Sequence, residues 1–269
     1  MRRVAALVAK DFAELRQSPG IFIPSLLTGL AAIFYPFVIA VIIPAVTGER
    51  LSDSSDFDIA KLFYQTEPSA PTLNPEAAIQ AFIFQQTLAL LVGLTTVTGG
   101  MSVAAHSIIG EKQARTLEPL LATPLKTREL LAAKVISAAI PGVLLTTACF
   151  VLYVVLIALI AEPGVWRALL TPRSLGLVFL IGPLASLFGL QLAVCASSRV
   201  NDPRRAQQLG ALVLIIPVGI LQVAQFVGGV VLDTHILLAI GAVLTVCNLL
   251  VLRAAISLFD RESILIKWK

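Results

Sequence analysis

The chain has 269 residues, of which 57% are hydrophobic and 13% are charged, and its mean hydropathy is +0.91. Soluble domains average about 45–50% apolar and about 25% charged residues, so this composition excludes a soluble globular protein and indicates an integral membrane protein. The formal net charge of +4 therefore gives no indication of nucleic-acid binding, because basic residues in such a protein mark one side of the membrane.

The chain opens with a segment that is amphipathic at helical spacing. Val4, Leu7, Val8 and Phe12 share one side of a helix, and charged residues lie mostly off that side. We expect residues 1–19 to form an interfacial helix in the headgroup region. The alternative is a solvated start to the first membrane span.

Hydrophobic runs without Asp, Glu, Lys or Arg then follow along the whole chain, and each reaches or nearly reaches the length of about 20 residues needed to cross a bilayer. They cover residues 17–48, 77–110, 135–161, 174–198, 206–232 and 234–252. Only Asp233 divides the last two, but together they are long enough for two spanning helices. We expect an all-α membrane protein in which residues 1–269 form one transmembrane domain with six spans.

One long connection interrupts these runs, at residues 47–79. It is acidic, with six carboxylates against Arg50 and Lys61, and its prolines argue against a single continuous helix. We expect an external loop of irregular or short helical structure.

The basic residues fix the orientation. Sixteen of the 20 Lys and Arg residues fall before the first span, between spans two and three, between spans four and five, or after span six. Positive charge is retained on the cytoplasmic side. The sequence therefore predicts a multi-pass protein of the inner (cytoplasmic) membrane with both termini in the cytoplasm.

Motifs for chemistry are missing from the sequence. It contains no HExxH, no GxSxG and no His/Cys pattern with metal-ligand spacing, and the two histidines, His106 and His235, lie far apart. It also lacks the GxxxxGK[ST] phosphate loop, and no span carries a charged residue near its middle, as ion-coupled carriers usually do. We therefore expect no enzymatic activity, catalytic residue, metal or cofactor on this chain. Driven transport would need energy from another polypeptide.

The segment 111–134 is the one densely charged stretch between two long hydrophobic runs. Within it, Leu117, Leu120 and Leu121 are spaced i, i+3, i+4, which predicts one apolar face of a short helix, and Pro124 ends that helix. A short amphipathic helix at the membrane surface is typical of a docking element.

This segment resembles the first cytoplasmic loop of ABC-2-type permeases, the six-helix membrane subunits of type-2 ABC exporters. The matching residues are Glu111, Thr116, Leu117, Glu118, Leu120, Leu121, Pro124, Glu129, Leu130 and Lys134. Arg115 and Pro119 depart from the usual pattern. Further similarity lies in the segment 198–208 and in the ending Phe259-Asp260-Arg261-Glu262.

The resemblance implies a permease domain whose loop 111–128 contains a coupling helix that docks on a separate ATPase subunit. The expected docking residues are Glu111, Arg115, Thr116, Leu117, Glu118, Leu120, Leu121 and Pro124. The leucines would form the buried anchor and the charged residues the rim. ATP and Mg²⁺ would bind the partner, present in two copies, and a second permease copy or a related permease would complete the membrane part.

Two alternatives stay open at this stage. The short helix could instead lie on the bilayer with its leucines in lipid, although its acidic residues disfavour an anionic leaflet. The chain could also be a non-transporting scaffold or receptor subunit that uses the loop 47–79 for recognition. For a transporter, the few aromatic residues mildly disfavour a sugar channel, and a hydrophobic or amphipathic substrate is expected.

Overall fold

The computed structural model describes residues 23–53, 73–113, 127–197, 203–228 and 233–258, together with Ala13 and Phe57. These residues form helices and connecting turns, with no strand among them. The predicted interfacial helix 1–19 lies outside this part except for Ala13. The all-helical expectation is confirmed.

The first helical rod, meaning a run of consecutive helical segments, is an α-helix interrupted by one π-helical turn. It consists of α2 (Ile23–Phe37), the π-helical turn η2 (Val38–Ile42) and α3 (Ile43–Thr47). Pro36 precedes the π turn. Because proline has no backbone N–H, one hydrogen bond of the α-helix is missing there, which favours a local change to π-helical hydrogen bonding. Gly48 then ends the rod at a φ of 72°, a left-handed conformation that glycine adopts without steric cost.

The long central helices follow a short 3₁₀ turn, η3 (Leu51–Asp53). Helix α5 runs over Pro75–Gln113 and α7 over Thr127–Ile160. Residues 75–79, which we expected in the external loop, therefore belong to a helix. Proline is well suited to a first helical position because its own N–H would lack a partner there in any case.

The remaining helices complete the bundle. After α8 (Val165–Leu169), the next rod combines α9 (Pro172–Gly176), the π turn η5 (Leu177–Ile181) and α10 (Gly182–Ser197). Helices α11 (Pro203–Gly228) and α12 (Thr234–Leu258) follow. Asp233 lies directly before α12, at the position where the sequence divides the last two hydrophobic runs.

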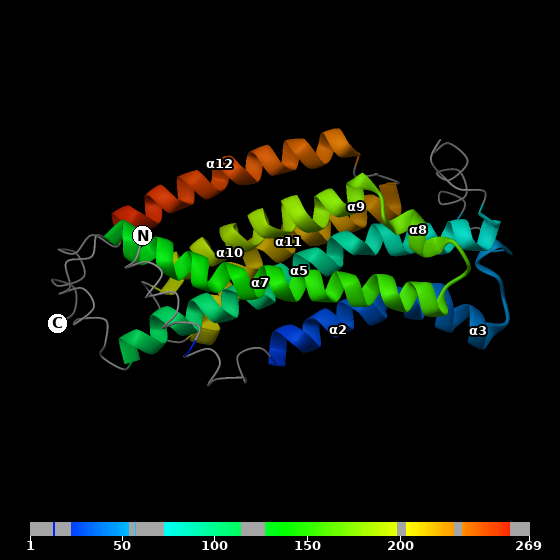
Figure 1. Ribbon diagram of the computed structural model, residues 1–269, viewed down its shortest axis with the longest axis horizontal. Coiled ribbons are helices and arrows are strands. Elements are labelled where there is room, and N and C mark those ends of the chain that lie inside the picture. The colour runs from blue at the N-terminus through cyan, green and yellow to red at the C-terminus, as the bar shows by residue number, and fades with distance from the viewer. Residues whose placement is uncertain are drawn as a thin grey trace.

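Five helical rods in the described residues are long and apolar enough to cross a membrane. They cover Ile23–Thr47, Pro75–Thr96, Ala139–Ile160, Pro172–Leu192 and Thr234–Ala254. Helix α11 contributes a shorter apolar stretch, Ile215–Gln225. The starts of α2, α7 and α11 and the ends of α5, α10 and α12 lie toward one end of the bundle, so successive rods alternate in direction (Figure 1).

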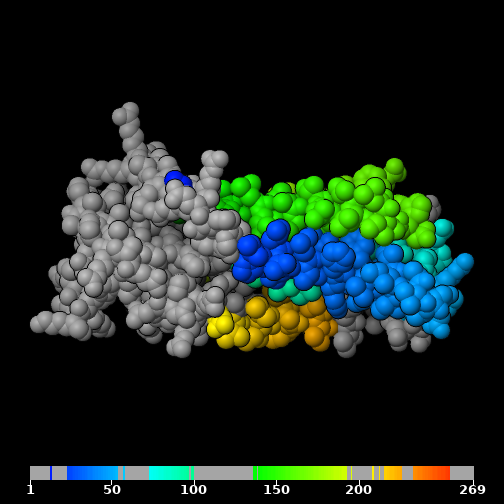
Figure 2. All heavy atoms as spheres, turned by 90° about the horizontal axis from the view of Figure 1, so that it is seen from below, coloured from blue at the N-terminus to red at the C-terminus, as the bar shows by residue number. Residues whose placement is uncertain are grey.

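Helix α5 is the centre of the bundle. In its most apolar stretch 72% of the residues are buried, against 17% in α12. It packs against α2, α7, α10 and α11, whereas α12 packs mainly on α10 (Figure 1). On the face seen in Figure 2, α2 lies between α7 and α11. Close approach of α2 is possible because a Cβ on Gly29 would lie only 2.8 Å from the Cys149 sulfur.

Candidate functional site

The predicted docking segment joins the two longest helices of the bundle. Glu111 lies in the last turn of α5, and α7 begins at Thr127, so both ends of the predicted loop 111–128 are helical. The other predicted docking residues lie outside the described residues. They are Arg115, Thr116, Leu117, Glu118, Leu120, Leu121 and Pro124.

Hydrogen bonds tie α5 to α7 within the membrane-spanning part. The Tyr153 hydroxyl lies 2.9 Å from the Thr87 hydroxyl and donates to the Phe84 carbonyl at 3.0 Å. Closer to the docking segment on both helices, the hydroxyls of Thr95 and Thr146 lie 3.2 Å apart. Polar groups inside a membrane need such partners, because lipid offers none. The two helices that carry the docking segment therefore form a bonded pair.

An aromatic cluster adds α2 to this pair. The ring centroids of Phe37 and Phe84 are 4.9 Å apart, and Tyr153 meets both rings edge-on at 6.1 and 5.8 Å. The Tyr153 side chain is fully buried. Edge-to-face contacts favour fixed ring orientations. The cluster thus fixes the position of α2 against α5 and α7 in the half of the bundle away from the docking segment.

Some uncharged polar side chains in the spans form hydrogen bonds to a neighbouring helix. Thr95 bonds Thr146 as described above, and the Gln222 amide nitrogen lies 3.5 Å from the Gln86 carbonyl oxygen. The Asn248 amide donates to the Leu184 carbonyl at 3.1 Å, which joins α12 to α10. Interhelical bonding of this kind is the usual role of amide and hydroxyl side chains in membrane bundles.

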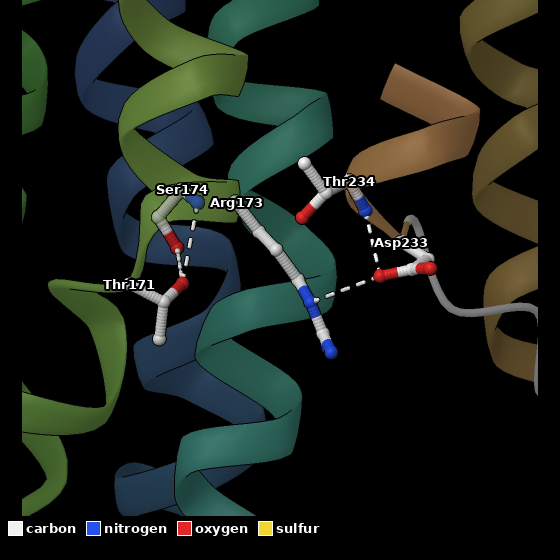
Figure 3. Close-up of polar contacts among 5 residues, drawn as sticks. All are labelled: Thr171, Arg173, Ser174, Asp233 and Thr234. Atoms are coloured by element: carbon white, nitrogen blue, oxygen red, sulfur yellow. Dashed lines mark hydrogen bonds and ion pairs between the residues drawn. The ribbon is translucent and has the colours of Figure 1, made fainter. Parts of the chain in front are cut away.

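At the opposite end from the docking segment, an ion pair joins the starts of two spans (Figure 3). Arg173 Nε of α9 lies 3.7 Å from Asp233 Oδ1, and the same oxygen accepts a hydrogen bond from the Thr234 backbone N–H at 2.7 Å. Beside it, the Thr171 side chain accepts a bond from the Ser174 N–H and caps α9. Sequence reasoning identified Asp233 as a boundary but had no signal for its pairing with Arg173.

Replacing Asp233 by alanine is expected to lower the free energy of unfolding by about 1 kcal/mol, because the first N–H of α12 loses its acceptor. The ion pair itself is half-exposed and contributes little. Asp233→Asn keeps an oxygen acceptor and should retain most of the stability. Unfolding of both variants in mixed micelles tests this expectation, and equal destabilisation by alanine and asparagine would contradict it.

The described residues hold no group of three His, Cys, Asp or Glu side chains placed to bind a metal ion.

Comparison with known proteins identifies one family. The family described as "ABC-2 family transporter protein" matches residues 5–239. No curated protein and no solved structure is significantly similar to the chain. The match spans the predicted docking segment and ends at residue 239, near the start of α12, so most of that helix lies outside it.

Proposed function

Because the chain belongs to the ABC-2 family of transporter proteins, we propose that it is the permease subunit of an ATP-driven exporter. Members of this family are membrane transport subunits, and membership implies association with an ABC ATPase subunit. In our proposal that separate subunit hydrolyses ATP, and this chain uses the released energy to export a hydrophobic or amphipathic substrate.

The permease in this proposal crosses the membrane six times, with α11 as the fifth span. Helix α11 has 26 residues and is about 39 Å long at 1.5 Å per residue, which exceeds a hydrocarbon core of about 30 Å. The alternating direction of the rods puts the predicted docking segment and the basic connections at the same end. The excess of Lys and Arg at that end supports a cytoplasmic location for it and for both termini, in the inner membrane.

ATP and Mg²⁺ bind the partner subunit in this proposal, because the sequence lacks a phosphate loop. The coupling helix within 111–128 would dock on that partner through Leu117, Leu120 and Leu121. Two ATPase subunits and a second permease copy, or a related permease, would make the complete transporter. Closure of the ATPase subunits around ATP would pull on the coupling helices and make the membrane halves rock outward.

The bonded α5–α7 pair is the observation that best supports this coupling. The docking segment is attached to both helices, and the Tyr153, Thr87 and Thr146 bonds keep them from sliding past each other. A pull on the segment would then move α5, the most buried helix, and α5 contacts α2, α10 and α11. A displacement at the docking end would reach the whole bundle.

Co-purification tests the proposal. The chain is expressed with a candidate ATPase, ideally one encoded by a neighbouring gene, and reconstituted into liposomes. We expect a stable complex whose ATP hydrolysis depends on the membrane subunit. Absence of both a complex and membrane-dependent hydrolysis would overturn the proposal.

The scaffold or receptor alternative predicts a different sensitivity. Deleting residues 51–66 from the external loop should abolish the activity of a recognition subunit, whereas an exporter should retain membrane-dependent ATP hydrolysis. The family match favours the exporter.

A further inference from the structure

A cavity of about 670 Å³ opens at the end of the bundle opposite the docking segment. Its walls come from the η2–α3 rod, the turn after Gly48, the start of α5 and the end of α7. These elements meet at one end of the molecule in Figure 1. The volume lies in the range of about 300–1,000 Å³ that is typical of small-molecule sites.

Hydrogen bonds between distant segments hold the cavity walls in place. The Gln80 amide, which is 6% exposed, donates to the Ala40 carbonyl at 3.2 Å and accepts from the Glu162 N–H at 2.9 Å. The Glu76 carboxylate accepts from the Leu51 and Ser52 N–H groups, both at 3.1 Å. The cavity is therefore preformed, with the first span, α5 and the end of α7 joined around it.

The lining has an apolar side and a charged side. Apolar walls come from Ala40, Val41, Pro44, Ile160 and Ala161. The charged side carries Glu49, Arg50, Glu76 and Glu162. The Glu76 carboxylate holds the turn, and within the described part of the chain no ion pair or hydrogen bond is made by the side chains of the other three. The lining thus carries groups of both signs. Ile160 is 52% exposed and is the last residue of the span Ala139–Ile160, so the apolar side of the cavity lies at the edge of the membrane-spanning part.

We propose that this cavity binds the zwitterionic head of a lipid-like molecule. The ammonium group would lie against Glu49 and Glu162, and the phosphate would bind Arg50, whose guanidinium matches phosphate geometry. The tail would leave the cavity along Ile160 into the bilayer. This binding goes beyond the proposed function, because it requires neither ATP nor an ATPase subunit.

Native mass spectrometry of the detergent-solubilised full chain tests the site with defined probes. These are lysophosphatidylethanolamine, its anionic counterpart lysophosphatidylglycerol, dodecyltrimethylammonium, and tail-less glycerophosphoethanolamine. We expect lysophosphatidylethanolamine to bind about tenfold or more tightly than each of the others, which corresponds to about 1.4 kcal/mol for a lost charge or tail contact. Equal binding of the zwitterionic and anionic lysolipids would overturn the proposal, and equal binding of the tail-less head would assign the site to a soluble zwitterion instead.

Substitutions then locate the site. The double variant Glu49→Gln/Glu162→Gln should lose the preference for the zwitterion over lysophosphatidylglycerol, and Arg50→Gln should lose its preference over dodecyltrimethylammonium. Asp53→Asn is the matched control, because Asp53 lies in the same acidic turn, accepts a bond from the Ser52 hydroxyl and does not line the cavity. Parental selectivity in both cavity variants, or the same loss in Asp53→Asn, would exclude this cavity as the binding site.

Discussion

Replacing Leu120 by aspartate is expected to uncouple ATP hydrolysis from transport while the protein still inserts into the membrane. Leu120 is the central leucine of the predicted coupling helix, so the new carboxylate would be desolvated and unpaired in the groove of the partner. Truncations at such anchors cost about 2 kcal/mol or more, which is over tenfold in affinity. The affinity of the ATPase subunit and its membrane-dependent hydrolysis, both measured in liposomes, check this result.

Two further variants make that test specific. Leu120→Met keeps an apolar side chain of similar volume and should bind the ATPase like the parent. Glu118→Lys reverses a charge at the predicted rim, where charge changes alter association rate more than tightness, so a partial, salt-sensitive defect is expected. If Leu120→Asp binds the ATPase and transports like the parent, the assignment of residues 115–123 to docking is wrong.

Replacing Tyr153 by alanine is expected to destabilise the bundle by about 3–5 kcal/mol, the usual cost of removing a large aromatic side chain from a packed core. Tyr153 is fully buried between Phe37 and Phe84, and its loss would leave a cavity where α2, α5 and α7 meet. Unfolding by denaturing detergent in mixed micelles measures the effect.

The conservative variant separates packing from hydrogen bonding at the same position. Tyr153→Phe keeps the ring and loses only the hydroxyl, and Thr87 still bonds the Ile83 carbonyl, so a cost below about 2 kcal/mol is expected. Leu159→Ala is a control on the same helix, since Leu159 is 76% exposed and faces away from the core. A loss in Leu159→Ala as large as in Tyr153→Ala would show that the core contact is not the cause.

The spans were predictable because length and the absence of charge are sufficient criteria for crossing a hydrocarbon core. The runs beginning at 17, 77, 135, 174 and 234 each contain most of a spanning helix in the structure. Boundaries were less accurate where helices continue past the apolar part. Helix α5 begins at Pro75 and ends at Gln113, because backbone hydrogen bonding, and not hydropathy, sets the ends of a helix.

The docking segment was also predicted from the sequence, whereas its attachment to the bundle is seen only in the structure. Its leucine spacing and its similarity to a family are properties of the sequence, and the family match supports the second of them. The structure adds that the segment is attached to α5 and α7, two helices joined by buried hydroxyl bonds. The contact with the ATPase subunit stays a prediction.

The sequence by itself determined that this is a membrane protein of the ABC-2 family, where its spans lie and which connections carry the positive charge. Only the tertiary structure decided that α5 is the central helix. Lipid tails and protein interiors are equally apolar, so no polar face in the sequence marks which side of a spanning helix is buried in protein. The structure also revealed the Tyr153 cluster, the Arg173–Asp233 pair and the cavity around Gln80. Each of them is formed by segments that are far apart in the chain and meet only when the helices pack together.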